Sequence, residues 1–163
     1  ITNINYFIII LCIEVIMFTS QFKVEKTWID HNEHMNVCYY QYVFQQALNR
    51  YWKHILEQDN NTGTDLAILP KSIHIRYLSE ALLGQLIAVD SFIYKLDYEG
   101  FAVFQEMKRD DTAICMFNQH VKFCTSGEAL IRRCDNSTYD ILFSIVKNTD
   151  ISLPRWIERP IDI

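Results

Sequence analysis

Apolar side chains recur every three or four residues from Val37 to Leu56, and this spacing predicts one long amphipathic helix. The positions on the apolar stripe are Tyr40, Phe44, Ala47, Leu48, Tyr51 and Ile55. Asn36 comes directly before the helix, where its side chain can accept a hydrogen bond from a free amide of the first turn. We therefore expect a helix that is capped by Asn36, ends near Glu57 and buries its aromatic stripe in the core.

Alternating patterns on both sides of this helix predict strands. Before the helix, residues 22–28 alternate loosely between apolar and charged side chains. Four segments after the helix carry alternating, β-branched or aromatic residues: 66–77, 85–96, 101–107 and 113–123. Turn-forming residues occupy 97–100 and 110–111. Pro70 has no amide hydrogen to donate, which predicts an edge strand or a bulge.

This order of elements predicts an α+β fold in which one antiparallel β-sheet wraps around a single long central α-helix. The short connections between strands suit an antiparallel sheet, and the wide apolar stripe of the helix needs a sheet face to cover it. Beyond the sheet, residues 139–146 predict a short helix and residues 154–160 an extended segment.

The chain has 163 residues, of which 50% are hydrophobic, and this is enough for one packed domain. Near its start, the apolar run 6–13 is interrupted by Glu14 and is too short to span a bilayer. It also lacks the positive start and the small-residue cleavage site of a signal peptide. We therefore expect residues 1–16 to be a non-domain apolar segment upstream of a natural start at Met17, with a membrane anchor as the alternative. Residues 17–163 are expected to form a single domain without a membrane partner.

Charge and cysteine content narrow the class of protein further. The formal net charge is −5 and no block of lysine and arginine is present, whereas nucleic-acid binding needs a concentrated basic face. We therefore expect no nucleic-acid partner. The five cysteines are odd in number and show no CxxC spacing, which favours a reduced, cytoplasmic compartment over a disulfide framework or a zinc site.

The densest polar cluster is the run 30–36 at the mouth of the long helix, with the sequence DHNEHMN. A carboxylate, two imidazoles and two amides converge there on a helix N-terminus, which is how an active site is commonly assembled. Each residue also has a structural interpretation: Asp30 can cap a turn, and His34 can serve as a hydrogen-bonded structural histidine. A metal site made of Asp30, His31 and His34 is disfavoured, because two histidines three apart outside a helix are a weak ligand pattern.

The motif Asp30-x-x-x-His34-x-Asn36, followed by Tyr40 on the helix, resembles that of the hotdog-fold acyl-CoA thioesterases, in particular the 4-hydroxybenzoyl-CoA thioesterase-like branch. The string WIDHNEHMNV at 28–37 is similar to the thioesterase module associated with carnitine dehydrogenases. The likeness extends in layout from Phe22 to Thr125, and the motif has the strand–loop–helix context that the family requires.

This resemblance implies a hotdog fold and an acyl-CoA thioester hydrolase. Asp30 would be the catalytic residue, acting as nucleophile on the thioester carbonyl or as general base on water. Backbone amides at the helix start, from Val37 and Cys38 to Tyr40, would polarise the carbonyl, while His34 and Asn36 would shape the site. Cys38 itself is expected to be a small buried cysteine. Coenzyme A would enter as part of the acyl-CoA substrate, and no separate cofactor or metal is expected.

The resemblance also implies a homodimer or a dimer of dimers (homotetramer) with sites between protomers. Some hotdog enzymes place their carboxylate on the central helix, but residues 37–56 contain no acidic side chain, so Asp30 is the expected catalytic carboxylate. The sequence does not single out the side chain that contacts the coenzyme A phosphates. The candidates are cationic residues of the sheet and tail: Lys71, Arg76, Lys122, Arg132 and Arg133.

One residue departs from the family pattern: Glu33 stands where a glycine usually precedes the motif histidine. Glycine takes a positive φ at little cost, whereas glutamate there is strained or sends the loop along another path. The change either alters the substrate or weakens catalysis. It keeps open a non-catalytic acyl-CoA-binding hotdog protein. A hotdog enoyl-CoA hydratase is disfavoured, because its Asp–His spacing is one residue longer and its motif proline is absent.

Overall fold

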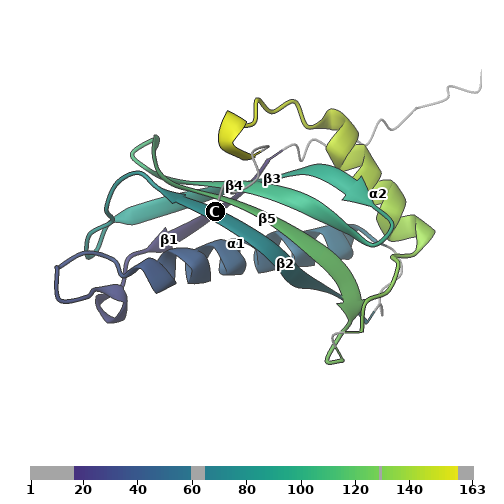
Figure 1. Ribbon diagram of the computed structural model, residues 1–163, viewed down its shortest axis with the longest axis horizontal. Helices are drawn as coiled ribbons and strands as arrows, with labels where there is room; N and C mark the ends of the chain where they lie inside the picture. Colours follow the sequence, from purple (N-terminus) through teal and green to yellow (C-terminus); the bar gives the residue numbers. More distant parts are fainter. Residues whose placement is uncertain (1–16, 60–64, 129, 158–163) are drawn as a thin grey trace, which may run out of the picture.

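A five-stranded antiparallel sheet curves around one long helix in the computed structural model, which describes residues 17–59, 65–128 and 130–157 (Figure 1). The strand order across the sheet is β1-β3-β4-β5-β2. The strands are β1 Phe18–Lys23, β2 Leu66–Tyr77, β3 Leu86–Asp97, β4 Gly100–Arg109 and β5 Thr112–Thr125. The predicted α+β hotdog architecture is therefore confirmed. The segment 1–16 lies outside the described residues.

The long helix α1 spans Val37–Gln58, close to the predicted limits. Asn36 is its N-cap, and its side-chain oxygen accepts a hydrogen bond from the amide of Cys38 at 3.0 Å. Every position of the predicted apolar stripe is buried, and these side chains pack with buried residues of the strands. The helix lies along one side of the curved sheet (Figure 1). Phe44 lies at the centre of this interface, where its ring stacks on Phe117 of β5 with 4.7 Å between centroids.

The strand before the helix differs from its prediction. The observed strand β1 is Phe18–Lys23 rather than 22–28, because it pairs with β3 from Phe18↔Ser91 to Lys23↔Leu86. Trp28 instead belongs to a short 3-10 helix, η1, at Lys26–Trp28, and is buried. The weak alternation of residues 22–28 therefore reflects the exit from an edge strand, with Trp28 turned into the core.

The later elements follow the prediction closely, with one correction in the tail. Pro70 lies on the edge strand β2, and the pairing register with β5 shifts between Pro70 and Ser72, as a bulge requires. The predicted short helix is α2, Asn136–Asn148, which lies near one end of the sheet (Figure 1). The prediction of an extended segment at 154–160 is wrong at Arg155–Ile157, which forms a 3-10 helix. Residues 158–160 lie outside the described residues.

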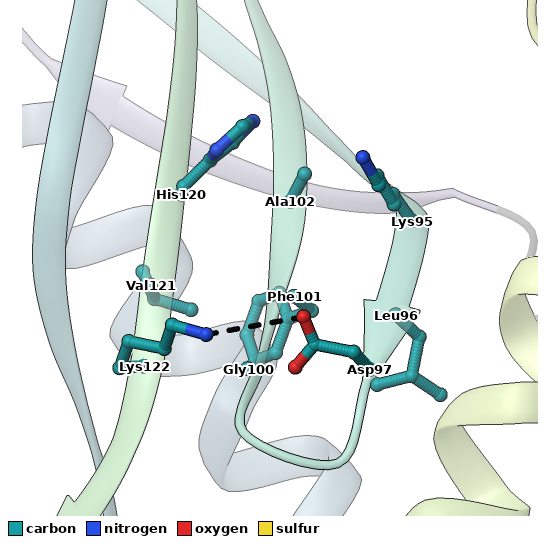
Figure 2. Close-up of a pocket in the computed structure, with 9 residues that line it drawn as sticks. All are labelled: Lys95, Leu96, Asp97, Gly100, Phe101, Ala102, His120, Val121 and Lys122. Atoms are coloured by element: carbon teal, nitrogen blue, oxygen red, sulfur yellow. Dashed lines mark ion pairs between the residues drawn. The ribbon is translucent and has the colours of Figure 1, made fainter. Parts of the chain in front are cut away.

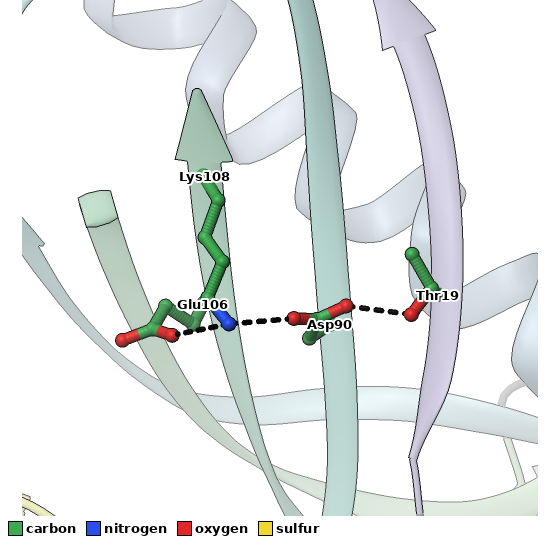
Figure 3. A network of polar contacts seen from close by, with 4 residues as sticks. All are labelled: Thr19, Asp90, Glu106 and Lys108. Atoms are coloured by element: carbon green, nitrogen blue, oxygen red, sulfur yellow. Dashed lines mark hydrogen bonds and ion pairs between the residues drawn. The ribbon is translucent and has the colours of Figure 1, made fainter. Parts of the chain in front are cut away.

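A network of polar side chains links strand β1 to β3 and, beyond it, to β4 (Figure 3). Thr19 donates to one carboxylate oxygen of Asp90 at 2.6 Å, and the Lys108 ammonium donates to the other at 2.9 Å. Lys108 also contacts Glu106 at 3.1 Å. The hydrogen bond to Asp90 raises the pKa of Lys108, and Asp90 is only 5% exposed. This network anchors the edge strand that leads into the polar cluster.

Candidate active site

The polar cluster folds as a tight hairpin between η1 and α1. Ile29 and Met35 pair as an antiparallel bridge, and the Asp30 amide donates to the His34 carbonyl at 3.0 Å. Inside the loop, the Glu33 amide donates to the Asp30 carbonyl at 3.1 Å. Glu33 has φ +65°, in the left-handed region. Three-residue hairpin loops commonly end in one left-handed residue, which is most often glycine.

This geometry explains the departure at Glu33. The backbone of Glu33 takes the left-handed conformation that favours glycine, despite its Cβ atom. The strain costs about 1–2 kcal/mol for a residue with a side chain. Glu33 is exposed, so its carboxylate remains in solvent. The strained backbone of Glu33 therefore lowers local stability.

Replacing Glu33 with glycine should stabilise the protein. Relief of the strain exceeds the extra flexibility that glycine brings to the unfolded chain, so we expect a gain of up to about 1 kcal/mol. The melting temperature should then rise by roughly 2–4 °C for a domain of this size. Glu25→Gly is the matched control, since Glu25 has φ −92° and the change should lower stability. A drop in melting temperature in both variants would contradict a strained Glu33.

The carboxylate of Asp30 is half-buried and held by one of its oxygens. Its Oδ1 atom accepts a hydrogen bond from the Asn32 amide at 2.8 Å, so the turn-capping interpretation of Asp30 is confirmed for this oxygen. Within the described part of the chain, the second oxygen Oδ2 has no hydrogen-bond or ion-pair partner. Asp30 can therefore hold the turn and still present an unpaired carboxylate oxygen.

The first amides of α1 differ in availability. The Cys38 amide is taken by the Asn36 side chain, and the Tyr39 amide donates to the Asn36 carbonyl at 2.9 Å. The Val37 amide has no partner among the described residues, and Val37 is 57% exposed. Unpaired amides at a helix N-terminus attract negative charge. Of the amides considered from the sequence, the structure thus leaves that of Val37 as the available donor.

His34 and Cys38 occupy different environments from those expected. His34 contributes main-chain groups, since its carbonyl closes the hairpin and the residue bridges to Leu82. Its ring has no hydrogen-bond partner in the described residues. The expectation of a small buried Cys38 is wrong, because Cys38 is exposed. It lies in the first turn of α1, to one side of the buried stripe.

A segment that the sequence did not connect to the site packs against it. The Ala81 amide donates to the Tyr40 hydroxyl at 2.9 Å, and the Ala81 carbonyl accepts from the Met35 amide at 2.8 Å. Burial raises the pKa of the Tyr40 hydroxyl, which keeps it neutral. The ring of Tyr77 meets that of Tyr40 edge-on, with 5.4 Å between centroids. These contacts arise only in the tertiary structure, and no local pattern signals them.

Three hollows on the described part of the surface are lined by residues other than Asp30. Figure 2 shows the smallest, of about 100 Å³, on β3, β4 and β5, where Lys122 and Asp97 approach within 3.9 Å. Burial and nearby positive side chains, including Lys95, lower the pKa of His120 beside this hollow. A second hollow of about 520 Å³ adjoins the network of Figure 3.

The third hollow has the largest volume of these three, about 610 Å³, and is called here the β1–α1 groove. It is lined by residues 21–26, Trp28, Tyr42, Gln46 and Arg50. Asp30 lines none of the three hollows. In the described residues, no three His, Cys, Asp or Glu side chains are grouped as metal ligands, and no helix is long and apolar enough to cross a membrane.

Comparison with known proteins gives two kinds of match. The family described as the thioesterase-like superfamily matches residues 24–135. Among solved structures, the hypothetical protein SAV2348 of Staphylococcus aureus, determined in complex with CoA, has a TM-score of 0.78 and 25% identity, covering 90% of this chain and 95% of that one. A 1,4-dihydroxy-2-naphthoyl-CoA thioesterase from Synechocystis has a TM-score of 0.64 and 13% identity, covering 83% and 99%. No curated protein matches the chain significantly.

Proposed function

Because the chain belongs to the thioesterase-like superfamily, we propose that it hydrolyses acyl-CoA thioesters at the hairpin between η1 and α1. One observation carries the proposal: the loop and the helix start present a carboxylate oxygen of Asp30 and an amide of Val37 that have no partner among the described residues. Thioester hydrolysis needs these two functions, a nucleophile or base and a donor for the developing oxyanion. The CoA complex of the Staphylococcus aureus relative supports coenzyme A as the thiol portion of the substrate.

Asp30 supplies the nucleophile or the base. As nucleophile, its carboxylate attacks the thioester carbonyl carbon, the C–S bond breaks, and CoA leaves as a thiolate that takes a proton. Water then hydrolyses the mixed anhydride and restores the carboxylate. As general base, Asp30 instead takes a proton from the water that attacks the same carbon; the C–S bond then breaks, and the CoA thiolate takes up the proton from Asp30, which restores the carboxylate. The hydrogen bond from the Asn32 amide orients the carboxylate for either route.

The Val37 amide supplies the oxyanion donor. It is the first amide of a 22-residue helix, and the helix dipole adds to its attraction for negative charge. Asn36 has a positioning role, since its side chain caps the helix and its amide donates to the Trp28 carbonyl at 2.8 Å. Cys38 and His34 border the site, and Tyr40 anchors the loop to Ala81.

We also propose that two copies of the chain share each site, in a homodimer or a dimer of dimers. Exposed apolar side chains gather on the segment beside the loop: Tyr77, Leu78, Leu82 and Leu83. Strand β2 is an edge of the described sheet, and an edge strand offers unpaired backbone groups to a second copy.

A panel of acyl-CoA substrates tests this function. The purified full chain should release free CoA thiol from at least one aliphatic or aromatic acyl-CoA, as followed with a thiol-reactive dye. Binding without turnover across the panel would contradict hydrolysis and favour an acyl-CoA-binding protein. Hydration of an enoyl-CoA without release of thiol would contradict it in favour of a hydratase.

A further inference from the structure

The β1–α1 groove has the chemistry of a nucleotide site, and we propose that it binds the adenosine 3′-phosphate 5′-diphosphate end of coenzyme A. This inference rests on the proposed acyl-CoA substrate. The groove has a volume of about 610 Å³, within the range of about 300–1,000 Å³ typical of sites for small molecules and cofactors. Its lining combines aromatic and cationic side chains, the groups that bind a purine and phosphates.

The aromatic side chains of the lining are Trp28 and Tyr42. Their two rings meet edge-on with 6.1 Å between centroids. The ring of Tyr39 also stacks on that of Trp28, with 5.8 Å between centroids. Trp28 is 7% exposed and therefore fixed, whereas Tyr42 is 49% exposed and open to a ligand. Stacking of a base on an aromatic side chain contributes about 1–3 kcal/mol and needs no base-specific hydrogen bond.

The positive charge of the lining comes from Lys23, Lys26 and Arg50, and Glu25 is the one carboxylate in it. Arg50 is held in place, because its guanidinium lies 4.3 Å from the Phe22 ring centroid and donates to a main-chain carbonyl of β1 at 3.2 Å. Lys23 and Lys26 have no ion-pair partner in the described residues. A local excess of positive charge on a chain of net charge −5 favours an anionic ligand.

The groove lies at a suitable distance from the proposed reaction site. Trp28 lines the groove and is two residues from Asp30. Along the helix, Val37 and Arg50 are thirteen residues apart, which corresponds to roughly 20 Å at 1.5 Å per residue. The extended pantetheine arm of coenzyme A separates the thioester sulfur from the diphosphate by a comparable length. A substrate whose carbonyl lies at Val37 can therefore place its phosphates beside Arg50.

Three of the five cations considered from the sequence are less suited to this role. Lys122 pairs with Glu99 at 3.1 Å, and Arg132 pairs with Asp65. Arg133 lies 4.6 Å from the ring centroid of Tyr98. Their charges are already satisfied within the protein, whereas those of Lys23 and Lys26 are available.

Adenosine 3′,5′-bisphosphate tests the groove directly, because its binding does not depend on catalysis. Isothermal titration with the full chain should show binding that weakens about tenfold in the double variant Lys23→Gln/Lys26→Gln, if each lysine contributes about 0.7 kcal/mol. Tyr42→Ala should weaken it comparably through lost stacking. Lys147→Gln, which removes one exposed cation from α2, is the matched control and should leave the affinity unchanged. Absence of binding to the wild-type chain, or equal binding to the double variant, would overturn the proposal.

Kinetics separate the coenzyme A assignment from adventitious nucleotide binding. The double variant should raise KM about tenfold for an acyl-CoA and leave KM unchanged for the acyl-pantetheine with the same acyl group. Equal changes for both substrates would overturn the assignment. A wild-type chain that binds the bisphosphate but hydrolyses no thioester would refute the proposed hydrolysis while leaving nucleotide binding by the groove intact.

Discussion

Replacing Asp30 with asparagine should lower the kcat for acyl-CoA hydrolysis by about 10²–10⁴-fold, the usual contribution of a positioned base or nucleophile. The asparagine side-chain oxygen can still accept the hydrogen bond from the Asn32 amide, so the hairpin should keep its shape. What is lost is the negative charge and basicity of the second oxygen, which has no partner in the described structure. Release of CoA thiol under saturating substrate measures the effect.

The matched control is Asp140→Asn, which removes an exposed carboxylate from α2 and should leave kcat unchanged. The melting temperature of the Asp30 variant should stay close to that of the wild type, because the change preserves size and the capping hydrogen bond. Full turnover by the Asp30 variant would exclude Asp30 as nucleophile or base. A large loss of melting temperature would instead assign Asp30 a mainly structural role in the turn.

The fold could be predicted closely because its signals are local. The period of α1, its asparagine cap and the alternation of β2 to β5 all lie within single elements, and burial of each pattern requires the others. The observed limits of the first strand differ from the predicted ones. An edge strand has only one neighbour, and the pairing of β1 with β3 decides its limits more than its own weak alternation. The prediction of an extended tail is wrong at Arg155–Ile157, which forms a 3-10 helix.

The candidate site divides in the same way. Asp30, Asn36 and the helix start are neighbours in sequence, so their convergence could be predicted. The contact of Tyr40 with Ala81 could not, because it joins positions 41 residues apart through the packing of a loop on the helix. The β1–α1 groove was also unforeseen, since its cations come from the end of a strand while its aromatic and arginine side chains come partly from one face of α1.

Replacing Phe44 with alanine should reduce the free energy of unfolding by about 3–5 kcal/mol, as expected for an aromatic side chain removed from a packed core. Phe44 is fully buried, and its ring stacks on that of Phe117 at an interplanar angle of 18°. Its carbonyl also accepts a hydrogen bond from the Gln105 side chain at 3.2 Å. Because neighbouring groups relax only partly, the change leaves a cavity between α1 and the sheet. Urea unfolding followed by circular dichroism measures the loss.

Phe143→Ala is the matched control, because it removes the same side chain from a 51% exposed position on α2. Its ring contacts only Tyr139 among the described aromatic residues, so we expect a loss of less than about 1 kcal/mol. Equal losses in the two variants would contradict a core centred on the contact between α1 and the sheet. Since α1 also carries the Val37 amide, the Phe44 variant should lose hydrolytic activity at lower temperature than the wild type, in step with its unfolding. Activity that falls well below the unfolding transition would instead show that helix position, rather than global stability, limits catalysis.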